Sequence, residues 1–170
     1  VINLAPGTYT GNISINGFFS GYSNVGAIQI VGGNSLDEAE DYIIDGWINT
    51  FNCPNMVLLK GITVTNYISV YYSNTLYCRY VISEEAIAFG IGGIFTNVHV
   101  IACKISNKTA YALGIVGGIL CAHGVSGSDN AVGYQAGSSS SGAGGIIIKA
   151  SGNALTASTL DSKYGGSQIW

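Results

Sequence analysis

Charged side chains are scarce in this chain: Asp, Glu, Lys and Arg make up only 9% of its 170 residues. The six basic residues are scattered and the net charge is −3, so no basic patch follows a phosphate backbone and we expect no nucleic-acid partner. Long hydrophobic runs are also missing. The longest, 86–95 and 110–122, fall short of the roughly 20 residues that span a bilayer, so we expect no membrane insertion.

Metal-binding and secretory signals are equally hard to find. The four cysteines could pair in three ways, but none has a spacing to a second Cys or to a His that indicates zinc, so we expect buried free thiols, no metal and no cofactor. The chain opens on Val1 without an initiator methionine or a basic leader, and we expect it to begin inside a fold.

What the chain has in quantity is glycine and apolar residues. It holds 25 glycines, and 48% of its residues are hydrophobic, so its surface must consist largely of Ser, Thr, Asn, Gly and Tyr. Val, Ile, Thr and Tyr favour pleated strands, while Gly and Asn suit sharp turns. The composition therefore predicts an all-β protein rather than a helix bundle.

A weak repeat indicates which all-β fold. A β-branched residue followed by a short polar residue recurs roughly every 20 residues, as a solenoid requires when each coil returns its strand to one face. We expect these repeat positions to stack on one face of a parallel β-helix; a β-sandwich with short strands is the alternative. The positions begin at Ile44, Val64, Ile82, Ile105 and Val125, with a further apolar one at 146–148.

Two segments interrupt the repeat. Residues 34–41 contain a capping-box pattern, Ser35 followed by Glu38, and we expect a one-turn helix or an ordered loop there. Residues 133–145 are rich in Gly, Ser and Ala, which is typical of a flexible loop or of a closely packed segment of small residues.

Three stretches resemble a known family. Residues 1–13 combine a strand, a Pro-Gly turn and a second strand, like the entry coil of pectin-lyase-like right-handed parallel β-helix proteins, and 60–66 and 103–107 are similar to coil edges of that superfamily. The resemblance covers about residues 1–150 as β-helix coils and leaves 151–170 as a C-terminal end segment. Within the superfamily the chain is most similar to bacteriophage or prophage tail fibres and tailspikes. The resemblance implies a homotrimer in the virion, assembled in the host cytoplasm.

Catalytic residues are few. Hydrolysis of a glycan needs two carboxyl groups, roughly 5 Å or 6.5–9.5 Å apart according to mechanism. Asp45 and Glu84 lie two coils apart in the expected repeat and are weak candidates. The acidic residues of 37–41 form either a solvated loop or a calcium site. No base stands beside a carboxylate pattern of the kind that a lyase uses. We therefore expect no catalysis in this segment, without excluding a hydrolase or lyase.

Aromatic residues are numerous for so uncharged a chain, with 11 Tyr, 5 Phe and 2 Trp. Rings on an outer groove would stack on sugars, and the alternative is that they cover core edges or pack between subunits. We expect Trp47, Phe51, Tyr71 and Tyr72 to bind glycan, and further rings cluster at Phe18, Phe19, Tyr22 and Tyr67.

These observations and the resemblance together predict a structural and receptor-binding module of a phage tail. Its partners would be host surface polysaccharide or another receptor, further copies of itself and other tail proteins. The alternatives are a polysaccharide depolymerase of the β-helix tailspike type and a secreted bacterial β-helix adhesin.

Overall fold

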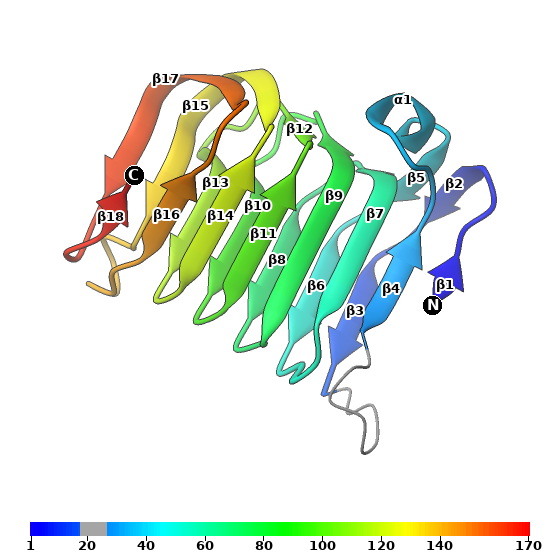
Figure 1. Ribbon diagram of the computed structural model, residues 1–170, viewed down its shortest axis with the longest axis horizontal. Helices are drawn as coiled ribbons and strands as arrows, with labels where there is room; N and C mark the ends of the chain where they lie inside the picture. The colour runs from blue at the N-terminus through cyan, green and yellow to red at the C-terminus, as the bar shows by residue number, and fades with distance from the viewer. Residues whose placement is uncertain (18–26) are drawn as a thin grey trace.

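The computed structural model of the protein describes residues 1–17 and 27–170. Its strands form one 18-stranded sheet whose paired strands run parallel, with a single short helix among the described residues. The strands follow one another along the long axis, with the two ends of the chain at opposite ends of the molecule (Figure 1). The all-β expectation is confirmed, and the parallel pairing is not that of a β-sandwich.

The sheet is β-helix-like, because strands pair with strands 19 to 35 residues further along the chain, most often about 20, and three columns result. We call the outer surfaces of the three columns the first, second and third faces. Three successive strands, one from each column, form one turn of the chain, which we call a rung. The first face consists of β1 (Ile2–Asn3), β4 (Ile28–Val31), the start of β7 (Val57–Val64), the start of β9 (Thr75–Ser83), β11 (Asn97–Ile101), β14 (Ile119–His123), β16 (Ile146–Lys149) and β18 (Gln168–Ile169).

The other two columns share the long strands. The second face consists of β2 (Gly7–Thr10), β5 (Tyr42–Asp45), the ends of β7 and β9, β12 (Lys104–Ile105) and the starts of β15 (Ser126–Ala136) and β17 (Ala154–Lys163). The third face consists of β3 (Ile13–Asn16), β6 (Ile48–Phe51), β8 (Ile68–Tyr71), β10 (Phe89–Ile94), β13 (Tyr111–Val116) and the ends of β15 and β17.

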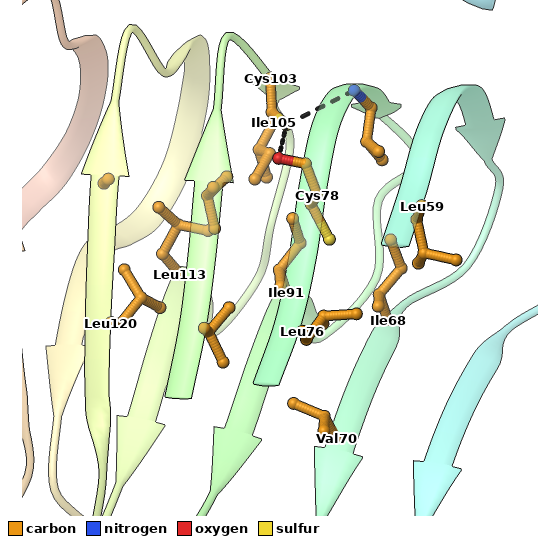
Figure 2. Packing of buried hydrophobic residues seen from close by; sticks show 14 of the residues in the cluster. Leu59, Ile68, Val70, Leu76, Cys78, Ile91, Cys103, Ile105, Leu113 and Leu120 are labelled. Atoms are coloured by element: carbon orange, nitrogen blue, oxygen red, sulfur yellow. Dashed lines mark hydrogen bonds between the residues drawn. The ribbon is translucent and has the colours of Figure 1, made fainter. Parts of the chain in front are cut away.

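Aliphatic side chains at matching positions fill the interior. On the third column Ile48, Ile68, Ile91 and Leu113 are paired in register, and all four are buried. Figure 2 shows such residues from neighbouring strands lying side by side. Each contributes about 1.5–3 kcal/mol by leaving water. Successive side chains of a strand alternate between the interior and the surface. Residues paired in register therefore point the same way, and each buried apolar side chain packs on the one from the next rung.

The cysteines belong to this core. All four are free. Cys53, Cys78 and Cys103 are buried, as expected, whereas Cys121 is only half-buried. The Cys103 thiol donates to the Cys78 carbonyl oxygen at 3.5 Å, one of the contacts drawn in Figure 2. Burial raises the pKa of Cys78 well above its usual value and that of Cys103 to about 12, so both remain protonated thiols.

The repeat positions stack only in part. Ile44 pairs with Val64 as expected, but Thr63 pairs with Ile82, which places Ser83 rather than Ile82 in that column. Ile105 then pairs with Ser83, and Ile148 lies on the first face opposite Cys121. The expectation of one continuous stack from Ile44 to Ile148 is therefore wrong. The corners between strands differ in length, and a shift of the register by one residue moves a side chain from the interior to the outer surface.

Residues with positive φ build one of the corners. Gly61, Tyr80, Ala102 and Gly124 occupy it on consecutive rungs, with φ between 49° and 62°. Glycine adopts this left-handed conformation without strain, whereas Tyr80 and Ala102 adopt it at a cost of about 1–2 kcal/mol each. The chain turns between its first and second faces here.

The expected helix is present as α1 (Leu36–Ala39). The hydroxyl of Ser35 accepts a hydrogen bond from the Glu38 backbone N–H at 3.2 Å, and the Glu38 carboxylate accepts one from the Asn34 N–H at 2.6 Å. These contacts satisfy backbone donors at the start of the helix, which is the physical reason for the sequence pattern.

Residues 151–170, which the sequence sets apart from the coils, continue the sheet. β17 pairs with β15, and β18 pairs with β16. On the rung formed by β16 and β17, charged groups occupy positions that are apolar on earlier rungs. Lys149 pairs with Ala122, and Asp161 pairs with Tyr134. The Lys149 ammonium and the Asp161 carboxylate are 2.7 Å apart, and the ammonium lies 5.3 Å from the centre of the Tyr134 ring.

Candidate functional site

The third face carries a continuous row of aromatic rings, which we call the ring row: Trp47, Tyr67, Phe89 and Tyr111. Ring centres are 6.3 Å apart from Trp47 to Tyr67, 4.7 Å from Tyr67 to Phe89 and 5.2 Å from Phe89 to Tyr111. Neighbouring planes are within 31° of parallel, so the rings stack along the long axis, one from each rung. Their faces therefore contact one another, and each pair contributes about 0.5–1.5 kcal/mol beyond its buried area.

Small residues beneath the ring row let the rings lie close to the sheet. The outward positions in register here are Asn49, Ser69, Gly92, Gly114 and Gln135. A methyl group added at Gly114 would come within 2.4 Å of a Tyr111 ring carbon, and one added at Gly92 would lie 3.2 Å from the Tyr111 hydroxyl oxygen. The two glycines are therefore part of the surface on which Tyr111 rests.

Beside the ring row, the third face contains a hollow of about 80 Å³. Ser69 lines it, is only 2% exposed, and its hydroxyl has no hydrogen-bond partner among the described residues. A buried hydroxyl without a partner costs about 1–3 kcal/mol, so it is unusual in a folded protein. The Asn49 side-chain oxygen, one rung earlier, is buried and unpaired in the same way within the described part of the chain.

Tyrosine hydroxyls flank the hollow. Tyr71 and Tyr111 both line it, and burial together with the nearby Tyr71 raises the pKa of Tyr111 to about 12. Tyr111 therefore keeps its proton at neutral pH and can donate a hydrogen bond. The side chains of Phe89, Ile94 and Val116 supply apolar walls, the Gln135 amide supplies a further polar group, and every lining residue is uncharged.

The four rings expected to bind glycan do not form one cluster. Trp47 belongs to the ring row, and Tyr71 lines the hollow. Phe51 and Tyr72 lie at the corner where the third face meets the first, in edge-to-face contact at 5.9 Å, and Tyr72 stacks on Phe95 at 5.6 Å. Phe18, Phe19 and Tyr22 lie outside the described residues. The ring faces mostly contact other rings, which agrees with the packing alternative for these aromatics.

The two catalytic candidates lie in one column, two rungs apart. Asp45 follows Ile44 and Glu84 follows Ser83, and at about 4.8 Å per rung their backbones are roughly 10 Å apart. Each carboxylate already has a partner: Asp45 accepts from the Thr65 hydroxyl at 3.0 Å, and Glu84 is 2.9 Å from the Lys104 ammonium. Since Lys104 lies on the rung beyond Glu84, that contact draws Glu84 away from Asp45.

Other kinds of site are not assembled by the described residues. No three His, Cys, Asp or Glu side chains of the described ranges come together as a metal would require. The one helix of residues 1–17 and 27–170 is far too short to cross a membrane.

The outer surface of the first face carries an apolar row, and the row beside it holds Lys60 and Arg79. Tyr77, His99, Cys121 and Ile148 follow one another in register, and the Tyr77 and His99 rings stack with centres 4.4 Å apart. Burial lowers the pKa of His99, so this row carries no charge at neutral pH. At its edge Ile119 and Ile146 pair with each other and are 40% and 36% exposed.

Sequence reasoning missed most of the residues around the hollow. Closeness in sequence does not point to Phe89 or Tyr111, and nothing in the sequence around Ser69 and Gln135 marks them as site residues. In a solenoid the neighbours of a residue lie one rung away, and aromatic residues recurring at 47, 67, 89 and 111 were the signal that could have found them.

Comparison with known proteins gives no family: no family model, no curated protein and no solved structure matches the chain.

Proposed function

We propose that the protein is a β-helical attachment module that binds cell-surface glycan at the hollow of the third face. The observation that carries this proposal is the Ser69 hydroxyl, buried at the hollow without a partner among the described residues. Tyrosine hydroxyls, an amide and apolar ring edges surround it. Glycans present alternating hydroxyl and C–H surfaces, and a site with a few polar groups set among apolar walls suits such a ligand.

The resemblance extends the proposal to a phage tail fibre or tailspike with a right-handed, pectin-lyase-like β-helix. The three parallel columns and their step of about 20 residues support it, because that superfamily has the same construction. A rigid rod of stacked rungs also suits a part that holds a binding surface away from a particle. Fold likeness alone does not assign the binding.

A homotrimer is part of the same proposal. The apolar, uncharged row on the first face, with Ile119 and Ile146 exposed beside it, supports burial of this face between copies. Interfaces between permanent subunits are enriched in such residues at their centres and depleted of charge.

Catalysis is not part of the proposal. Asp45 and Glu84 are engaged with Thr65 and Lys104, and neither lines the hollow. A depolymerase would need both carboxylates free to act on one sugar.

The experiment is a binding screen of the full chain against neutral and acidic surface oligosaccharides, with release of reducing ends and of unsaturated sugars measured in parallel. We expect binding without release, and at least tenfold weaker binding for Tyr71→Ala. Phe95→Ala, which removes an exposed ring from the corner instead of the hollow, is the matched control and should bind normally. Release of sugar that disappears in Asp45→Ala or Glu84→Ala would replace this proposal with a depolymerase, and absence of binding to every member would overturn it.

A further inference from the structure

The size and lining of the hollow indicate which part of a glycan it takes. Its volume of about 80 Å³ is below that of a cavity that encloses benzene, roughly 150 Å³, and far below the roughly 300–1,000 Å³ of pockets that enclose a whole ligand, so it accommodates a substituent of a few heavy atoms but does not enclose a sugar ring. A single hydroxyl would leave much of that volume unfilled. The occupant must therefore be a substituent larger than a hydroxyl and much smaller than a sugar.

The lining also fixes the charge of that substituent. All residues around the hollow are uncharged, so a carboxylate, a sulfate or an ammonium would lose its hydration there without gaining a counter-charge, which is costly. Uronic acids and amino sugars with a free amine are disfavoured for this reason. A neutral substituent that combines an apolar end with a polar end remains.

We propose that the hollow is a subsite for the acetamido group of N-acetylated neutral sugars. This inference rests on the proposed function, which it narrows from glycans in general to those that carry N-acetylhexosamine. An acetamido group has one methyl, one strong acceptor and one donor. Ile94, Val116 and the edge of Phe89 provide apolar contacts for the methyl.

Donors and an acceptor are available for the polar end. The Ser69 hydroxyl, which has no partner within the described ranges, can donate to the acetamido carbonyl oxygen. The Tyr111 hydroxyl, still protonated at neutral pH, is a second donor at the same hollow. The side-chain carbonyl of Gln135 can accept from the acetamido N–H.

The experiment measures binding of paired oligosaccharides that differ only in the acetamido group: N-acetylglucosamine with glucose trimers, and the corresponding galacto and manno pairs. We expect the N-acetylated member of at least one pair to bind roughly tenfold more tightly, about the effect of one well-placed hydrogen bond with its apolar contacts. Ser69→Ala removes a donor, and Gly92→Ala narrows the hollow beside Tyr111 while keeping an ordinary backbone conformation. Both variants should lose the preference for the N-acetylated member, and Phe95→Ala should keep it.

The outcomes separate the two proposals. Equal binding of both members of every pair would overturn the acetamido subsite and leave glycan binding intact. A preference that survives in both Ser69→Ala and Gly92→Ala would place the acetamido group elsewhere and likewise overturn the inference. Absence of binding to every oligosaccharide would overturn the proposed function as well. Chemical denaturation of each variant shows whether it is folded before its binding is compared.

Discussion

The Lys108 side chain is buried, and its ammonium donates a hydrogen bond to the Glu85 backbone carbonyl oxygen at 2.6 Å. Burial lowers the pKa of Lys108 from its usual 10.5 to about 8, although the nearby Glu85 and Glu84 act in the opposite direction. Between these two pH values the unfolded chain holds more protons than the folded one, so stability increases with pH through this window. The penalty for burying the charge is fully present below about pH 8.

We therefore expect Lys108 to add a rise in the free energy of unfolding that begins near about pH 7.5, and Lys108→Met to lack it. Above about pH 9 the buried Cys78 and Cys103 act in the opposite direction, because their pKa values are raised and their thiols ionise first in the unfolded chain. Tyr111 and Tyr134 do the same above about pH 10. The measurement is therefore the difference between the urea-denaturation profiles of wild type and Lys108→Met from about pH 7 to 9.5. An identical pH profile in wild type and Lys108→Met would contradict the assignment.

Core packing gives a second prediction. Leu113 is fully buried between Ile91 and Tyr134 of the neighbouring rungs, so Leu113→Ala should lower the free energy of unfolding by about 2–5 kcal/mol. Ile119→Ala on the outer surface of the first face is the comparison, and in the isolated chain it should cost less than about 1 kcal/mol. Equal losses measured by urea denaturation would mean that the inward and outward positions are misassigned.

The corner between the first and second faces gives a third prediction. A methyl group added at Gly124 would meet Ala102 at an ordinary 3.7 Å, so the cost of Gly124→Ala is conformational and we expect about 1 kcal/mol. Ala102→Gly at the same corner, where φ is already positive, should not lower stability by more than a few tenths of a kcal/mol. Thermal and urea unfolding of the pair test this, and a larger loss for Ala102→Gly than for Gly124→Ala would contradict it.

The different burial of the four thiols gives a fourth prediction, on their rates of labelling. Cys121 is half-buried on the outer surface of the first face, whereas the other three cysteines are buried and two have raised pKa values. We expect one thiol of the native monomer to react with a disulfide reagent much faster than the rest, and Cys121→Ser to abolish that fast phase. Four equal rates would show that the native fold does not protect the core thiols.

The proposed trimer gives a fifth prediction. Light scattering should report three times the mass of one chain, and Ile146→Lys should shift the assembly toward monomer by placing a charge in the buried face. Cys121 should label more slowly in the trimer than in that variant. A wild-type chain that remains monomeric at high concentration would exclude the trimer.

Much of the fold was predictable because local rules determine it. The step of about 20 residues anticipated parallel columns, and the Ser35–Glu38 pattern anticipated the start of α1. The register was not predictable at every rung. Whether Ile82 or Ser83 follows Val64 in the column depends on how many residues the corner at Tyr80 takes up, and propensity does not fix that number.

The site was harder to anticipate than the fold. Trp47 and Tyr71 were named from their aromatic character, but the importance of Ser69 depends on being covered by rings from other rungs. A serine that ends buried without a partner among residues 1–17 and 27–170 has no distinguishing signal in a sequence already rich in serine. Only the pairing of β8 with β6 and β10 brings these groups together.

The ion pair of Lys149 and Asp161 changes what holds its rung to the neighbouring rung. Ala122 and Tyr134 occupy the paired positions there, and two partly exposed charges gain little from packing against such apolar side chains. The stack should therefore open at this rung before it opens between the aliphatic rungs, so that backbone amides of β16 and β17 exchange their hydrogens sooner than those of β8 and β10.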